Sequence, residues 1–279
     1  MPPNGFEAKF IARKLLNEFI KSRRQGLSAR TIEFYHGYLT RARSVVGVQI
    51  SGHAVKQFLD SIPCSNGGKH AYYRVLRTFY HWLYSPKSGL GLVSADNPML
   101  MIDPPKVGKR ILPSLSPQQL DYLMEQANCV RDKTIISLFA DSGLRLSELT
   151  NIRNDDIDWQ NRLIKVICKG NKEAIAVFGK RTDELLKQWL SEYVPNNGNI
   201  WGLNQWGIVD MLQQLRKKTG LPCNPHTFRR TFASILAKRG VDSLHIMRLG
   251  RWESIQMVER YTRSVQFEDS LKLYSDIVN

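Results

Sequence analysis

Two motifs in the second half of the sequence place cations where they could bind one phosphate group. Arg145 follows a glycine turn in DSGLRLSEL, at the expected start of a helix, where free backbone N–H groups and the helix dipole favour an anion. Glu148 lies three residues further on and can orient the Arg145 guanidinium. His226 and Arg229, in PHTFRRTFA, share one helical face, and Arg230 points elsewhere as a structural or solvent-facing residue.

Other side chains offer an acid and a nucleophile for phosphodiester cleavage. Lys169 lies in the predicted turn CKGNK, where a flexible ammonium can give a proton to a leaving 5′ oxygen; Lys172 is the competing candidate. Tyr261, in VERYTR, can attack phosphorus and conserve the ester bond energy in a phosphotyrosine, and Tyr274 is a weaker alternative. Trp252 precedes Tyr261 by nine residues. Cations, a nucleophile and an acid together can cut a phosphodiester without a metal.

Each of these residues alone has an ordinary explanation, because surface arginines, solvated turn lysines and core tyrosines are common.

A metal-dependent alternative rests on the acidic cluster Asp155, Asp156 and Asp158 in NDDIDW, which a nuclease could use. We favour a polar turn between a helix and a strand there. The sequence contains no GxxxxGK[ST] phosphate loop. We therefore expect neither a metal nor a cofactor.

The composition indicates a polyanionic partner. The chain has 279 residues, 42% of them hydrophobic, and a net charge of +15, so it can build a core and is not a disordered polycation. Residues 1–110 hold seventeen Lys and Arg against six Asp and Glu, whereas residues 111–279 hold twenty-three against nineteen. The first part is therefore predicted to bind nucleic acid through its positive charge, and in the second part the positive and negative charges are close to balanced.

A membrane partner and a disulfide framework are not expected. No run of eighteen apolar residues could span a bilayer, and the start MPPNGFEAKF lacks a signal-peptide profile. The four cysteines are scattered and form no CxxC pair, so we interpret them as ordinary small hydrophobic residues in a reducing, cytoplasmic setting.

Hydrophobic periodicity predicts a mainly α-helical protein with one small antiparallel sheet. Apolar stripes and cap residues such as Ser28 and Gly143 indicate helices. Alternating segments around Lys169-Gly170-Asn171 indicate a β-hairpin. The predicted strands are 163–167 and 174–178, and the predicted helices are 6–24, one starting at 29, 53–62, 69–84, one capped by Ser116, 132–142, one starting near 145, 182–194, 206–219, 226–239, 242–249, 254–263 and 267–277.

The proline- and glycine-rich stretch 86–113 predicts a linker between two domains, 1–85 and 114–279. In the segment 69–84 the aromatic residues are expected in the core, and the interleaved Lys69, Arg74 and Arg77 are expected to meet phosphate.

The order of the candidate residues resembles the tyrosine recombinase (phage integrase) family over nearly the whole chain. SGLRLSEL is similar to the family's first arginine motif, and CKGNKEAIAV to its β-hairpin lysine motif. HTFRRTFA is similar to its His-x-x-Arg motif, and LGRWESIQMVERYTR to its closing segment with the nucleophile. The resemblance implies an N-terminal helical core-binding domain followed by a catalytic domain.

The resemblance also implies a role for each residue. Arg145 and Arg229 would bind the scissile phosphate, Lys169 would protonate the leaving oxygen, and His226 would assist proton transfer. Tyr261 would form a 3′-phosphotyrosyl bond. Trp252 stands where many members carry a second histidine, and its N–H can donate one hydrogen bond but cannot act as an acid or base.

The implied activity is site-specific recombination of double-stranded DNA through a Holliday junction, with four protomers holding two duplexes. The final helix could dock on a neighbouring protomer or on its own domain, through Leu271, Leu273 and Ile277. Two alternatives stay open: a type IB topoisomerase with the same chemistry, and a catalytically inactive DNA-binding accessory factor.

Overall fold

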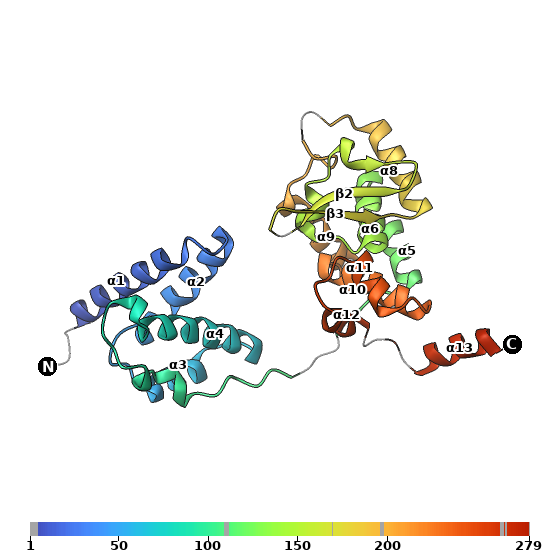
Figure 1. Cartoon of the computed structure of the whole chain (residues 1–279). Coiled ribbons are helices and arrows are strands. Elements are labelled where there is room, and N and C mark those ends of the chain that lie inside the picture. Colours follow the sequence, from blue (N-terminus) through green and yellow to red (C-terminus); the bar gives the residue numbers. More distant parts are fainter. Residues whose placement is uncertain are drawn as a thin grey trace. The chain divides into compact units, whose positions relative to one another are not determined.

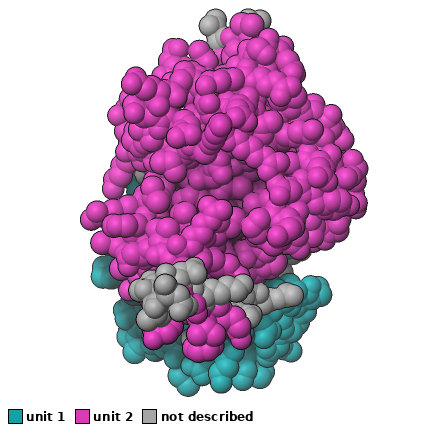
Figure 2. All heavy atoms as spheres, turned by 90° about the vertical axis from the view of Figure 1, so that its right-hand side faces the viewer, with its two compact units in different colours: residues 1–109 teal, residues 110–279 magenta. Residues whose placement is uncertain are grey.

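The computed structural model describes residues 5–108, 112–168, 170–195, 198–262, 265 and 267–278. The chain forms two compact units, Met1–Lys109 and Arg110–Asn279, shown in teal and magenta in Figure 2. Each unit has its own hydrophobic core. The predicted class is confirmed, since helices dominate both units and the sheet is small and antiparallel (Figure 1). No helix within the described ranges is long and apolar enough to cross a membrane.

Unit 1 packs its helices around Phe19. The Phe19 ring meets Tyr35, Phe79 and Trp82 edge-on, with centroids 5.4–5.6 Å apart. Ser28 caps the second helix by accepting a hydrogen bond from the Thr31 N–H, as its position predicts. The elements of this unit are α1 (Gly5–Arg23), α2 (Ala29–Arg41), η1 (Arg43–Val45), α3 (Gly52–Ser61), α4 (Asn66–Leu83), η2 (Pro86–Ser88), η3 (Ser94–Asp96) and η4 (Pro98–Met101).

Helix α4 carries its aromatic residues inward and its arginines outward. Tyr72, Tyr73, Phe79, Tyr80 and Trp82 are buried, which confirms their prediction as core. Arg74 and Arg77 are exposed one turn apart, whereas the Lys69 ammonium donates to the Asp60 carbonyl at 2.8 Å. The two arginines are therefore the cations of this helix that stay available to a polyanion.

The N-terminal unit extends further than the linker prediction allows. Three short 3-10 turns, η2 to η4, lie within residues 86–101, and Met99 and Ile102 are buried in the core of unit 1. The Tyr73 hydroxyl donates to the Ile102 carbonyl at 3.2 Å. The division between the two units falls between residues 109 and 110, inside the predicted linker 86–113, and unit 1 extends beyond residue 85.

Unit 2 surrounds the buried helix α6 with further helices and a three-stranded sheet of order β1-β2-β3. Strand β1, only two residues long, was not predicted because so short a segment shows no alternation; it pairs Ile157 with Ile164. The elements are α5 (Pro117–Gln126), α6 (Val130–Ser142), α7 (Leu146–Thr150), η5 (Asn154–Asp156), β1 (Ile157–Asp158), β2 (Leu163–Cys168), β3 (Lys172–Val177), α8 (Lys180–Glu192), α9 (Gln205–Thr219), α10 (Pro225–Lys238), α11 (Ser243–Leu249), α12 (Ile255–Thr262) and α13 (Phe267–Val278).

Helix starts and stops in unit 2 follow the sequence signals. Ser116 and Gln119 form a reciprocal capping box at α5, with Pro117 in the first helical position. Gly143 ends α6 in the left-handed conformation, with φ of 57°. A β-carbon at Gly143 would also lie 2.7 Å from the Phe232 ring. Both the left-handed backbone and the lack of space therefore favour glycine at this position.

The last helix touches its own domain at the end of α10. Lys238 and Asp269 form an ion pair at 3.0 Å, and the Leu273 side chain lies against Gly240. Leu271 and Tyr274 are exposed, and the Ile277 side chain lies outside the described part.

Candidate active site

The turn between α6 and α7 presents Arg145. Arg145 is the N-cap residue of α7, and its backbone N–H donates to Glu148 Oε2 at 2.9 Å. Its guanidinium donates through Nη1 to Glu148 Oε1 at 2.6 Å, which confirms that Glu148 orients it. The Glu148 side chain is buried, whereas 31% of the Arg145 side chain stays exposed and can meet a ligand.

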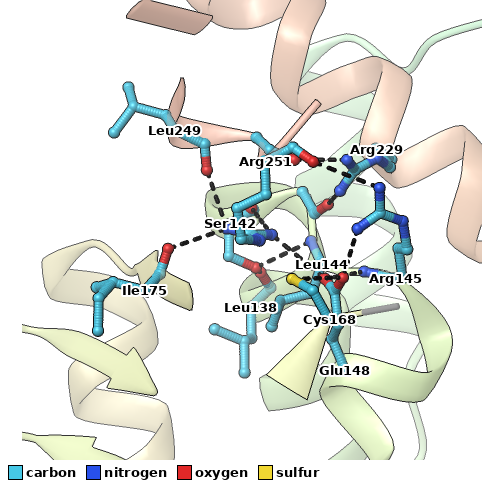
Figure 3. A network of polar contacts seen from close by, with 12 residues as sticks. Leu138, Ser142, Leu144, Arg145, Glu148, Cys168, Ile175, Arg229, Leu249 and Arg251 are labelled. Carbon is cyan, nitrogen blue, oxygen red and sulfur yellow. Dashed lines mark hydrogen bonds and ion pairs between the residues drawn. The ribbon is translucent and has the colours of Figure 1, made fainter. Parts of the chain in front are cut away.

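Helix α10 brings Arg229 to the same turn. The buried Arg229 guanidinium donates through Nη1 to the Gly143 carbonyl and through Nη2 to the Gly250 carbonyl. Burial, and after it the charge of Arg145, lowers the pKa of Arg229 to about 10. The side chain still carries its charge at neutral pH, and it lies close to Arg145 in Figure 3.

His226 lies one turn before Arg229, at the exposed start of α10. Although the residue is exposed, partial desolvation by the surrounding protein lowers the pKa of its imidazole, and the charges of Arg230, Arg229 and Arg145 lower it further. The ring is therefore neutral at pH 7 and can accept a proton.

Arg230, the neighbour of Arg229, is a structural residue. Its Nε donates to the Pro113 carbonyl at 3.0 Å, and its Nη2 donates to Thr227 Oγ1 at 2.9 Å. It is 7% exposed, so the structural interpretation is confirmed and the solvent-facing one is wrong.

Trp252 separates the arginine cluster from Tyr261. Its ring centroid lies 4.3 Å from Arg229 Cζ and 5.4 Å from the centroid of the Tyr261 ring. Trp252 is buried, and its Nε1 has no hydrogen-bond partner among the described residues. The structure thus joins Arg145, Arg229, Trp252 and Tyr261 in one cluster, with an unused N–H donor inside it.

Lys169 lies outside the described residues, so its side chain is not placed. Strands β2 and β3, which flank its turn, pair from Leu163 with Val177 up to Cys168 with Lys172, which confirms the predicted hairpin. The competing Lys172 is exposed. The Cys168 thiol donates to Glu148 Oε1 at 3.4 Å, which links the end of β2 to the carboxylate that holds Arg145.

Arg251 belongs to the cluster although the sequence reasoning did not select it. Its guanidinium is buried and lies 3.6 Å from Glu148 Oε2, opposite the side that Arg145 occupies (Figure 3). Three guanidinium groups, from Arg145, Arg229 and Arg251, thus gather around one carboxylate. The excess positive charge suits an anion such as a phosphodiester. A basic residue between the glycine and tryptophan of LGRWES was the available signal, but the motif alone does not show where its side chain goes.

Glu148 remains ionised inside this cluster. Its burial opposes ionisation, but hydrogen bonds from the backbone and side chain of Arg145 and the charge of Arg251 outweigh burial and lower its pKa.

The acidic cluster in NDDIDW forms a turn, as we favoured. Asp156 accepts the Arg153 N–H at 2.8 Å, and Asp158 accepts two hydrogen bonds from Asn161. Within the described ranges, no group of three or more His, Cys, Asp or Glu side chains could hold a metal ion. The four cysteines are free thiols; Cys223 is buried, but Cys64 and Cys129 are exposed and do not act as core residues.

Comparison with known proteins agrees with this geometry. The model of the phage integrase family matches residues 113–267. Tyrosine recombinase XerD of Listeria innocua is 29% identical over 211 residues, which cover 68% of this chain and 69% of the relative. Tyrosine recombinase XerC of Chlamydia muridarum is 32% identical over 189 residues, or 60% and 59% of the two chains.

Solved structures show the same fold. The XerH site-specific recombinase in its post-cleavage complex with a palindromic difH substrate superposes with a TM-score of 0.72 at 18% identity, covering 95% of this chain and 84% of that one. The Tn1549 transposon integrase in complex with a circular intermediate DNA gives 0.69 at 18% identity, covering 95% and 99%. With its arginine cluster, its β-hairpin and its paired tryptophan and tyrosine inside the matched segment, this chain belongs to the phage integrase family.

Proposed function

We propose that the chain is a site-specific tyrosine recombinase that cuts and rejoins double-stranded DNA through a 3′-phosphotyrosyl intermediate and a Holliday junction. The convergence of Arg145 and Arg229 on the Gly143 turn, beside the Trp252–Tyr261 pair, carries this proposal. It supplies the cations and the nucleophile that phosphodiester cleavage needs.

Cleavage begins when Tyr261 Oη attacks the scissile phosphorus. The bond from phosphorus to the 5′ oxygen breaks, the 3′ phosphate becomes an ester of Tyr261, and the other strand end leaves as a 5′ hydroxyl. Arg145 and Arg229 neutralise the charge that builds on the phosphoryl oxygens. Lys169 gives the leaving oxygen its proton.

Proton transfer at the nucleophile falls to His226. Because its pKa is lowered, the imidazole is neutral and can take the Tyr261 hydroxyl proton at neutral pH. Trp252 Nε1, buried without a partner in the described part of the chain, offers one more donor to the phosphate.

Rejoining reverses this chemistry on a second duplex. A free 5′ hydroxyl from the partner duplex attacks the phosphotyrosine and releases Tyr261, so that no ATP and no metal ion are required. We propose that four copies hold two duplexes and that the protein acts in the cytoplasm, where its DNA substrate lies.

Two other functions share part of this architecture. A type IB topoisomerase would use the same residues but relax supercoiled DNA as a monomer with little sequence preference. An accessory factor would bind DNA without cutting it. A footprint on a defined sequence together with the mass of the complex separates the first from a recombinase, and formation of a covalent adduct excludes the second.

Covalent capture tests the proposal directly. The full chain is incubated with a library of nicked duplexes of randomised sequence, and DNA that stays attached after denaturation is recovered and sequenced. We expect adducts on one related set of sequences. Tyr261→Phe removes them, whereas Tyr274→Phe, at an exposed position on α13, keeps them. Adducts that persist in Tyr261→Phe would refute the assignment of the nucleophile.

A further inference from the structure

Arg251 adopts a backbone conformation that is costly for its residue type. It lies between α11 and α12 with φ of 56°, in the left-handed region that favours glycine. Its guanidinium is only 6% exposed. Non-glycine residues keep such a conformation when surrounding contacts over-determine it, so the contacts of this side chain indicate what it does.

The Arg251 guanidinium joins segments that are far apart in the sequence. Nη1 donates to the Leu249 carbonyl at 2.9 Å and lies 3.4 Å from the Ile175 carbonyl on β3. Nη2 donates to the Ser142 carbonyl at the end of α6 at 3.0 Å and pairs with Glu148 Oε2. Both terminal nitrogens are thus engaged with the protein, and Nε, which has no partner among the described residues, is buried, so the guanidinium presents no exposed fork to a phosphate.

Two of these contacts lead to Arg145, the partly exposed arginine that can meet a ligand. Glu148 binds Arg145 through Oε1 and Arg251 through Oε2, so the two guanidiniums fix the carboxylate from opposite sides. Arg145 Nη2 also donates to the Arg251 backbone carbonyl at 3.3 Å. The neighbouring Gly250 carbonyl accepts from Arg229.

We propose that Arg251 is a positioning residue for strand cleavage, which fixes Glu148 and the turn 250–252 and thereby aims Arg145 and Arg229 at the scissile phosphate. This inference rests on the proposed function. Without the Arg251 guanidinium, Glu148 keeps its hydrogen bonds from Arg145 and Cys168 but loses the second of its two guanidinium partners. The left-handed turn also loses its contacts with α6 and β3. The phosphate-binding arginines then lose their fixed geometry while their own atoms stay intact.

The test compares Arg251→Met with the wild-type chain on two duplexes of a sequence recovered by covalent capture. One carries the natural phosphodiester, and the other carries a methylphosphonate at the scissile position. A methyl group in place of one oxygen removes the negative charge, so cleavage depends less on well-placed cations. Arg248→Met, the same change at an exposed position of α11, is the matched control.

We expect Arg251→Met to slow phosphodiester cleavage by about 100-fold, the cost of a small misplacement in a preorganised site. The methylphosphonate should be slowed much less, and Arg248→Met should change neither rate at saturating protein. Equal slowing of both substrates by Arg251→Met, or no slowing, would overturn the proposal. If covalent capture with the wild-type chain recovers no adduct on any sequence, the proposed function itself fails.

A double-mutant cycle with Glu148→Gln separates positioning from direct contact with the phosphate. If Arg251 acts through Glu148, Arg251→Met should cost little more in the Glu148→Gln background. Fully additive effects would mean that Arg251 acts independently of Glu148, contrary to the proposal.

Arg251→Gly guards against misfolding, because glycine adopts φ of 56° without strain. It should fold and show the same substrate-dependent loss as Arg251→Met. Unfolding of both variants at the assay temperature would make Arg251 a determinant of stability and would also overturn the proposal.

Discussion

The Arg229 guanidinium lies over the indole of Trp252, with Cζ 4.3 Å from the ring centroid. The same indole also packs against the Tyr261 ring, with centroids 5.4 Å apart. Trp252 therefore connects the arginine cluster to α12, the helix that carries Tyr261. In the proposed reaction, it would act as a spacer between two groups that meet at one phosphorus atom.

Replacing Trp252 by Phe tests the unused donor in this spacer. The ring packing is largely kept, but the Nε1–H is lost. A hydrogen bond to a charged group contributes about 1.5–3 kcal/mol, so we expect single-turnover cleavage to fall by roughly 10- to 100-fold. Trp252→His restores a donor and should recover part of the rate. If the Phe variant cleaves as fast as the wild type, the indole acts by packing alone.

Glu148→Gln removes the carboxylate that pairs with Arg145 and Arg251 and whose charge also acts on Arg229. Leaving buried charges without their partner costs about 3 kcal/mol, which should appear as a loss of unfolding free energy at pH 7. Because the folded-state pKa of Glu148 is lowered from its ordinary 4.5, its stabilisation is complete above that value and lost as the pH falls through the folded-state pKa. Denaturant unfolding from pH 7 to acid should therefore show wild type and variant converging. A constant difference would contradict the assignment.

The titration of His226 should set how the cleavage rate depends on pH on the acid side of neutrality. Its pKa is lowered from 6.5 by partial desolvation and by three neighbouring arginines, so the imidazole loses its proton below that pH. Since only the neutral ring can accept the tyrosine proton, the rate should rise with pH below 6.5 and level off above it. His226→Asn should be slow and lack this limb. His245→Asn, at an exposed position on α11, should keep it.

Gly143→Ala should destabilise the fold far more than Gly220→Ala, because only at Gly143 would the new β-carbon meet another side chain. The left-handed φ of 57° costs a β-carbon about 1–2 kcal/mol, and the contact with the Phe232 ring at 2.7 Å adds overpacking. Gly220→Ala has a similar φ of 71° but meets nothing within 4 Å, so only the backbone cost applies. In thermal unfolding, the Tm of Gly143→Ala should lie well below the Tm of Gly220→Ala. Equal losses of Tm would show that the Phe232 ring moves aside freely.

Arg74 and Arg77 should contribute to DNA affinity but not to cleavage. Both are exposed on α4, and the charge of unit 1 predicts contact with phosphate. Replacing either by Ala should lower the salt dependence of binding by about one unit of slope, with the cleavage rate at saturating protein unchanged. Filter binding at several salt concentrations measures the slope. An unaltered slope would place the DNA elsewhere on the surface.

Local signals in the sequence predicted most of the helices and two residue pairs of the site. The Arg145–Glu148 pair and the His226–Arg229 pair follow from i, i+3 spacing, and the caps at Ser28, Ser116 and Gly143 follow from local chemistry. These features depend only on neighbours in the chain, so the residue types alone are enough to predict them.

The features that sequence reasoning missed depend on contacts between distant segments. Arg251 reaches the carbonyls of Ser142 and Ile175, and backbone carbonyls have no residue-type signature. The segment 86–102 has the composition of a linker, yet Met99 and Ile102 complete a core made by other helices. In both cases tertiary packing decides the outcome.

The two carbonyls that hold Arg229 belong to Gly143 and Gly250, which enter the chain at very different times during synthesis. A ribosome makes the basic unit 1 first, then the Gly143 turn, and more than a hundred residues later the turn 250–252 and Tyr261. A nascent chain can therefore expose its positively charged unit before Arg229 has gained the Gly250 carbonyl. If the proposed reaction is correct, an unfinished copy would bind DNA before it could cut it, because Tyr261 is made after the arginines that it joins.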